Sequence, residues 1–185
     1  MLAMKTTLLS TAVLSGLSSL TSALPTLPTL TTCTPIISPF LLITTTTPNC
    51  GPSTTMPNVS AISVYDPAHS TTLNLRTILP GYNSLPNFTL ADGTLQTISF
   101  GPFGLKPQLY NATGGTSNQP LGFQAAASPV GRLGLSMGYL LANNDDDSEG
   151  WTLCKDSYGE TVITWQGTDP SCQHTYVQAT NTAPY

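Results

Sequence analysis

Carboxylates and histidines are the side chains in this 185-residue chain that could transfer protons. The glutamates are Glu149 and Glu160, both in expected loops beside strands, whereas glycoside hydrolysis needs two carboxylates on facing walls. The two histidines, His69 and His174, lie in polar turns, where a solvated ring is the expected state. Because no nucleophile–base pair can be named, we expect a protein without catalytic activity. A glycoside-active enzyme is the remaining catalytic alternative.

The run Asn143-Asn144-Asp145-Asp146-Asp147-Ser148-Glu149 concentrates oxygen ligands of the kind that calcium prefers. It lacks the alternating acidic spacing of an EF-hand loop, and a solvated hairpin loop explains it better. Neither cysteine pair has metal-ligand spacing. We therefore expect no metal and no cofactor.

Aromatic side chains near amides and carboxylates suggest a different chemistry, which is sugar binding. Exposed Trp or Tyr rings stack on pyranoses while Asp, Asn or Gln hold the hydroxyls. Tyr139, Trp151 and Trp165 lie close in sequence to Asn143 and Asp145, and these five form a candidate glycan-binding site. The competing interpretation, which we favour for both tryptophans, is that they fill the core.

Four cysteines, Cys33, Cys50, Cys154 and Cys172, suit an oxidising compartment and allow three pairings. We prefer Cys33–Cys50 with Cys154–Cys172, since both close short loops and the second brackets an expected strand. Both bridges would then be structural.

The N-terminal segment predicts secretion. Residues 1–23 carry one charge, Lys5, then a short apolar stretch and a small-residue cleavage site, which is typical of a signal peptide. The Pro- and Thr-rich residues 24–39 are expected to form an extended arm before a single domain over 40–185. Glycosylation sequons begin at Asn58, Asn87 and Asn111.

Charge excludes some classes of partner. Residues 24–185 hold four basic residues against nine acidic ones, and charged residues make up 8% of the chain. Nucleic acids and anionic membranes require clustered Lys and Arg. We expect neither as a partner, and we expect a monomer that binds cell-wall polysaccharide or an extracellular protein.

The sequence pattern predicts that these residues are positioned by β-strands. From Phe40 onward, short runs rich in β-branched and aromatic residues alternate with Gly, Pro, Asn or Asp, and no helical period appears. The expected runs are 40–46, 61–65, 73–78, 88–97, 108–111, 121–127, 133–142, 151–154, 161–165 and 175–181. An all-β domain is predicted.

A weak repeat refines this prediction. FTLADGTLQT (88–97) resembles LGLSMGYLLA (133–142), with a glycine at the turn of each hairpin. A third copy is divided between 175–181 and 40–46, so that the chain ends meet. Two further strands lie between successive copies. Three units of four strands predict a β-trefoil-like barrel of about twelve strands, with a two-sheet β-sandwich as the alternative.

The C-terminal third carries a resemblance. Its pattern W-x-x-C, then W-x-G-x-D-x-x-C, Y-x-Q-A and a terminal APY resembles small secreted proteins of filamentous ascomycete fungi. That uncharacterised group is IgE-binding-like and distantly similar to phialide-type cell wall proteins. The resemblance implies a secreted or wall-associated fungal protein with no assigned catalytic residue.

Two non-catalytic functions remain open at this point. The first is a wall protein that binds glycan. The second is a protease inhibitor or host-directed effector, which needs a protruding rigid loop; residues 111–120 and 143–150 are the candidates.

Overall fold

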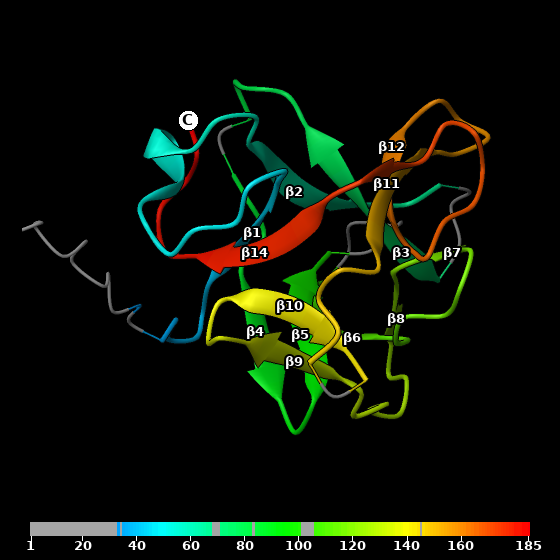
Figure 1. The fold of residues 1–185 in the computed structure, drawn as a ribbon. Coiled ribbons are helices and arrows are strands. Elements are labelled where there is room, and N and C mark those ends of the chain that lie inside the picture. Colours follow the sequence, from blue (N-terminus) through cyan, green and yellow to red (C-terminus); the bar gives the residue numbers. More distant parts are fainter. Residues whose placement is uncertain (1–32, 34, 68–70, 83, 101–105, 145) are drawn as a thin grey trace, which may run out of the picture. The chain divides into compact units, whose positions relative to one another are not determined.

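The computed structural model describes residues 33, 35–67, 71–82, 84–100, 106–144 and 146–185 (Figure 1). The predicted signal peptide, most of the N-terminal arm, His69 and Asp145 lie outside these ranges. The described chain is all-β, as predicted, with a single 3-10 turn, η1 (Ser53–Thr55). Within the described residues, no helix is long and apolar enough to cross a bilayer.

Fourteen strands form in the described residues, two more than predicted. Six of them build a ring: β1 (Leu41–Thr45), β4 (Phe88–Ala91), β5 (Thr94–Ser99), β9 (Leu133–Ser136), β10 (Leu140–Asn143) and β14 (Tyr176–Thr180). Six more form outer hairpins: β2 (Ser60–Tyr65), β3 (Thr72–Ile78), β6 (Gln108–Ala112), β8 (Gly122–Ala125), β11 (Trp151–Lys155) and β12 (Thr161–Trp165). The two strands that were not predicted are β7 (Gln119–Pro120) and β13 (Gln173–His174). Each has only two residues, too few for a recognisable sequence pattern.

The two similar sequence segments fold as similar hairpins. β4 pairs with β5 around Asp92-Gly93, and β9 pairs with β10 around Met137-Gly138. All four of these turn residues have positive φ, between 47° and 80°. Such turns match the natural twist of the flanking strands, which explains why a glycine recurs at the second position. Both predicted hairpins are confirmed.

The chain ends meet to make a third pair. β14 runs antiparallel to β1 from Leu41↔Thr180 to Thr45↔Tyr176, and the two strands lie side by side in Figure 1. The predicted pairing of residues 40–46 with 175–181 is therefore confirmed.

Weaker links join the three pairs into a nearly closed, barrel-like sheet. Phe40 and Phe88 exchange backbone hydrogen bonds of 2.9 and 2.8 Å. Leu140 of β10 pairs with Gln178 of β14. The Leu133 N–H, at the start of β9, donates to the Gly93 carbonyl oxygen in the β4–β5 turn at 2.8 Å and links these two hairpins.

The outer hairpins β2–β3, β6–β8 and β11–β12 contact one another outside the ring. Leu73 of β3 pairs with Phe123 of β8, and Arg76 of β3 pairs with Val162 of β12. The segment before β8 lies along β12, since the Asn118 N–H donates to the Trp165 carbonyl at 2.8 Å. These contacts bring loops from distant parts of the sequence to the surface of β12.

The hydrophobic core is formed by the inward-facing side chains of the strands. Its largest fully buried side chains include Phe40, Phe88, Tyr110, Phe123 and Trp151. Burying each such side chain contributes about 1.5–3 kcal/mol. Buried threonines, such as Thr97 and Thr164, fill other inward positions on the strands. The core thus needs none of the few charged residues.

Two disulfides add covalent links. Cys33 pairs with Cys50 across a Cα–Cα distance of 5.4 Å, and Cys154 pairs with Cys172 across 4.1 Å. Both preferred pairings are confirmed. They are compatible with an extracellular protein.

Candidate functional site

The tryptophans of the predicted glycan site lie in the core. Trp151 and Trp165 are opposite each other on β11 and β12, with 0% and 4% of their surfaces exposed. Their rings meet edge to face at 4.8 Å, and the Trp151 Nε1–H donates to the Leu141 carbonyl at 2.7 Å. This burial agrees with the favoured core interpretation, because a ring that stacks on sugar must be accessible.

Two other predicted site residues, Tyr139 and Asn143, are also inaccessible. Tyr139 is buried, and Asn143 is fully buried, with its Nδ2 donating to the Gly115 carbonyl at 3.0 Å. An added Cβ on Gly115 would lie 2.4 Å from that nitrogen, so glycine permits the contact. Asp145 lies outside the described residues. The structure therefore argues against a sugar platform formed by the predicted set.

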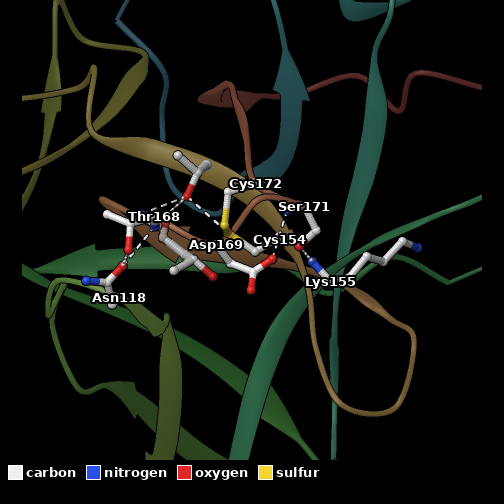
Figure 2. The surroundings of a disulfide bond; sticks show 10 residues. Asn118, Cys154, Lys155, Thr168, Asp169, Ser171 and Cys172 are labelled. Atoms are coloured by element: carbon white, nitrogen blue, oxygen red, sulfur yellow. Dashed lines mark hydrogen bonds between the residues drawn. A yellow bond between two sulfur atoms is a disulfide. The ribbon is translucent and has the colours of Figure 1, made fainter.

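A pocket of about 370 Å³ lies instead beside the Cys154–Cys172 disulfide, and we call it the polar pocket after the polar side chains named below. Figure 2 shows the side chains around this disulfide. Lys155 reaches it from the end of β11. Thr168 and Asp169 come from the loop after β12, and Asn118 comes from the loop between β6 and β8. Carboxylate, amide and hydroxyl groups thus line one opening, whereas the Lys155 ammonium donates to the Gly159 carbonyl at 3.1 Å.

Hydrogen bonds hold the loop after β12 in place at the pocket. The Asn118 Oδ1 accepts from the Thr168 N–H at 2.8 Å and from the Thr168 hydroxyl at 2.9 Å (Figure 2). The Lys155 N–H donates to the Ser171 hydroxyl oxygen at 3.1 Å. Gly167 allows the close approach of loop and disulfide, because an added Cβ there would lie 2.5 Å from the Cys154 Sγ. The pocket is consequently pre-formed.

Asp169 supplies the negative charge of the pocket. Hydrogen bonds from the Ser171 hydroxyl and then from the Ser171 backbone N–H lower the pKa of Asp169 below its ordinary value of 3.8, against a small desolvation effect. The backbone bond is 2.8 Å long. The Asp169 carboxylate is exposed and ionised at neutral and mildly acidic pH, so it can accept hydrogen bonds from a ligand.

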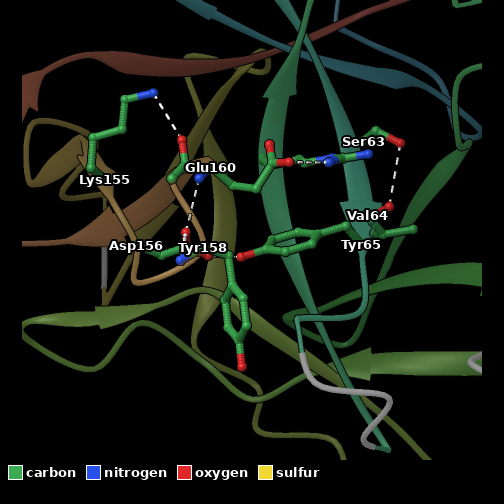
Figure 3. Close-up of polar contacts among 9 residues, drawn as sticks. Ser63, Val64, Tyr65, Lys155, Asp156, Tyr158 and Glu160 are labelled. Carbon is green, nitrogen blue, oxygen red and sulfur yellow. Dashed lines mark hydrogen bonds and ion pairs between the residues drawn. The ribbon is translucent and has the colours of Figure 1, made fainter.

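A second polar cluster braces the turn between β11 and β12 (Figure 3). The Arg76 Nη1 contacts the Glu160 Oε1 at 2.8 Å, and the Arg76 guanidinium lies 5.1 Å from the centre of the Tyr65 ring. The Tyr65 hydroxyl donates to the Asp156 Oδ2. The Asp156 Oδ1 accepts the backbone N–H groups of Tyr158 and Glu160, each at 2.9 Å. These carboxylates are therefore occupied by structural partners.

Tyr158 is the accessible aromatic residue at the tip of this turn. Its side chain is 62% exposed, and in Figure 3 its ring extends away from the braced cluster. Asp156, two residues earlier, also lines the polar pocket. An exposed ring thus lies on the turn next to the pocket.

The structure also bears on the metal site, the histidine and the inhibitor loop considered from the sequence. Within the described residues, no group of three or more His, Cys, Asp or Glu side chains could hold a metal ion. The His174 Nε2 contacts the Glu149 carbonyl at 2.9 Å, and its ring meets Tyr176 edge to face. The candidate inhibitor loop 111–120 is hydrogen-bonded to β12 through the Asn118 N–H and the Trp165 carbonyl at 2.8 Å. The Ser117 hydroxyl also donates to the Oε1 of Gln166, just after β12, at 2.6 Å.

The three sequons differ in accessibility. Asn58 and Asn87 are exposed, whereas Asn111 has 8% of its surface exposed. The Asn111 Nδ2, which would carry the sugar, donates to the Ala127 carbonyl at 2.7 Å. Its Oδ1 accepts from the Gln96 Nε2 at 3.0 Å. The folded structure favours Asn58 and Asn87 as acceptors and argues against Asn111.

No family model, curated protein or solved structure matches this chain. The geometry of the pocket is therefore the basis for assigning a function. Sequence reasoning missed Asn118, Thr168 and Asp169, because Asn118 is distant from them in sequence and the aspartate is typical of a turn. The one available signal was the short loop closed by Cys154 and Cys172, since Thr168 and Asp169 lie just before the second cysteine.

Proposed function

We propose that this chain is a secreted, non-catalytic protein that binds a cell-wall polysaccharide through the polar pocket. One observation carries the proposal: the ionised Asp169 carboxylate and the Asn118 amide face the same pre-formed opening. Sugar hydroxyls both donate and accept hydrogen bonds, so a site for them needs acceptors and donors together. Asp169 provides acceptors, and the Asn118 Nδ2 provides donors.

The size of the site suits a short segment of polysaccharide. Binding pockets for small molecules range from about 300 to 1,000 Å³, and this one, at about 370 Å³, is at the lower end. One sugar would occupy the pocket, and a neighbouring sugar would stack on Tyr158. Secretion and wall association follow from the predicted signal peptide and the fungal resemblance, and the two disulfides support them.

A β-trefoil is part of the same proposal. A ring strand, an outer hairpin and a second ring strand follow one another three times along the chain, from β1 to β14. Two short distances distinguish this fold from a two-sheet sandwich, namely Phe40 to Phe88 and Gly93 to Leu133. Nuclear Overhauser contacts within both pairs support the trefoil, and their absence would favour the sandwich.

The binding proposal is tested by retention on insoluble chitin, β-glucan and mannan, with free oligosaccharide as competitor. The variants are Asp169→Asn, which keeps an oxygen for Ser171 but removes the charge, and Asn118→Ala. Loss of a hydrogen bond to a charged group should weaken retention roughly 10–100-fold.

Asp147→Asn is the matched control. The Asp147 Oδ1 also accepts a backbone N–H two residues on, from Glu149 at 3.1 Å, but Asp147 does not line the pocket. Retention by Asp147→Asn should equal that of the wild type. Equal retention by all three variants, or no retention of the wild type on any polymer, would overturn the proposal.

A further inference from the structure

A second cavity, of about 620 Å³, is lined by β4, β5 and β6, by Ser63 and Val64 of β2 and by residues 84–87, and it shares no lining residue with the polar pocket. None of the described residues that line it is charged. Ile98, Phe100 and Leu109 contribute to its surface and are 68%, 60% and 49% exposed. Three large apolar side chains exposed together on one face call for a covering group.

The strand register places a glycosylation sequon in this apolar face. Phe88 pairs with Thr97, and both point inward with 0% and 2% exposure. Side chains alternate along a strand, so Asn87 lies outward at the position opposite Ile98. Ile98 in turn pairs with Leu109 on β6. Asn87, Ile98 and Leu109 therefore form one row across the outer face, with strands about 4.8 Å apart.

The acceptor itself is accessible and held in place. Asn87 is exposed and lines the cavity, as does Thr89, the hydroxyl residue of the same sequon. The Thr97 hydroxyl donates to the Asn87 carbonyl at 2.9 Å, which fixes the backbone of the acceptor. A sugar attached here would begin beside Ile98.

We propose that an N-linked glycan on Asn87 folds back over Ile98, Phe100 and Leu109 and is an integral part of the surface. The bond forms between the Asn87 Nδ2 and C1 of the first sugar. It forms as the C1–oxygen bond to a lipid diphosphate donor breaks, with loss of one amide proton. The C–H faces and acetyl methyl groups of the first two N-acetylglucosamines cover the apolar side chains. Their polar groups meet Gln96 and Ser99, which also line the cavity.

This inference rests on the secretion that the proposed function includes, and not on the sugar-binding pocket. Asn58 provides the internal comparison, since it is exposed but does not line the cavity. A glycan on Asn58 should be tolerated without stabilising the fold. A glycan on Asn87 should stabilise it and shield the apolar row.

The experiment secretes the full chain from a yeast host and maps glycan occupancy by mass spectrometry of its peptides. Asn87 should be occupied. Thermal unfolding is then compared for the wild type, Asn87→Gln and Ser60→Ala, which removes the Asn58 sequon but keeps Asn58 at its φ of 54°. Loss of the Asn87 glycan should lower Tm by about 2–4 °C, and loss of the Asn58 glycan by less than about 1 °C. Asn87→Gln should also raise binding of a hydrophobic dye.

A double-mutant cycle tests the contact itself. In an Ile98→Thr/Leu109→Thr background, whose substitutions fall on exposed positions, Asn87→Gln should no longer lower Tm. The inference is overturned if secreted protein carries sugar on Asn58 but not on Asn87, or if Asn87→Gln and Ser60→Ala melt alike. A glycosylated dimer that buries Ile98 and Leu109 would also overturn it. If the chain is not secreted into the medium, the glycan inference is overturned, because it requires secretion. The proposal that the polar pocket binds sugar is tested separately, by the retention assay.

Discussion

At the scale of single residues, accessibility separates the candidate ligands from the structural residues. The Trp151 ring could stack on a sugar but is fully buried. Asp169 and Asn118 have smaller side chains, but they line an open pocket. The sequence could predict that Trp151 and Trp165 belong to the core. It could not bring Asn118 to Thr168, because those residues are 50 positions apart and meet only after the outer hairpins associate.

Asn111 provides a test of the buried polar contacts. Asn111→Ala should lower the free energy of unfolding by about 1–3 kcal/mol, because it leaves the Ala127 carbonyl and the Gln96 amide without their partner. Denaturant unfolding of protein made without glycans measures this change. Asn181→Ala, at an exposed position without a positive φ, should change stability by less than about 0.5 kcal/mol. Equal effects would contradict the described geometry of Asn111.

The depressed pKa of Asp169 predicts how binding depends on pH. Since the pKa in the folded protein lies below the ordinary 3.8, the carboxylate protonates only as the pH falls below that value. Polysaccharide retention should therefore be constant from about pH 7 to about pH 4.5 and decline at lower pH. Retention assays across this range, with a carboxyl NMR titration of Asp169, make the comparison. A decline centred near pH 6 would point to another group.

At the scale of elements, turn chemistry made the hairpins predictable. Asp92-Gly93 and Met137-Gly138 mark equivalent turns in both sequence and structure. The two-residue strands β7 and β13 were not predictable, because they depend on neighbours from other hairpins. The same limit applies to the candidate site, whose loop is held by tertiary contacts rather than by local sequence.

The Cys154–Cys172 bridge closes the segment that carries the pocket, with a sequence separation of 18 residues. Replacing both cysteines by alanine should cost about 3 kcal/mol of unfolding free energy, as expected for a loop of this length. Polysaccharide affinity should fall as well, since Asp169 and Lys155 lie near opposite ends of the closed segment. Calorimetry and retention assays measure the two effects. Unchanged affinity in a folded double variant would show that the bridge does not organise the pocket.

At the scale of the whole domain, the ring depends on a few weak links between strong hairpins. One of them, from the Leu133 N–H to the Gly93 carbonyl, passes through a turn glycine rather than along a strand. The low charge of the chain is consistent with this architecture, because threonine and apolar side chains fill the inward positions. The meeting of the two ends of the domain was predictable from the divided repeat.

Gly93 tests this closure against a matched glycine. Gly93 and Gly159 both have positive φ, 72° and 80°, but an added Cβ lies 2.8 Å from the Gly131 backbone at Gly93 and meets nothing within 4 Å at Gly159. Gly159→Ala should cost about 1–2 kcal/mol from backbone conformation alone. Gly93→Ala should cost clearly more in denaturant unfolding. Equal costs would mean that the ring does not close tightly at Gly93.

The most direct test of the proposed binding function is an NMR titration of the ¹⁵N-labelled protein with soluble oligomers of chitin, β-glucan and mannan. The pocket predicts saturable shifts for one polymer class, concentrated at the amides of Asn118, Lys155, Thr168 and Asp169 and lost in Asp169→Asn. Shifts that map elsewhere, or no shifts with any oligomer at millimolar concentration, would contradict the assignment of this pocket to sugar binding.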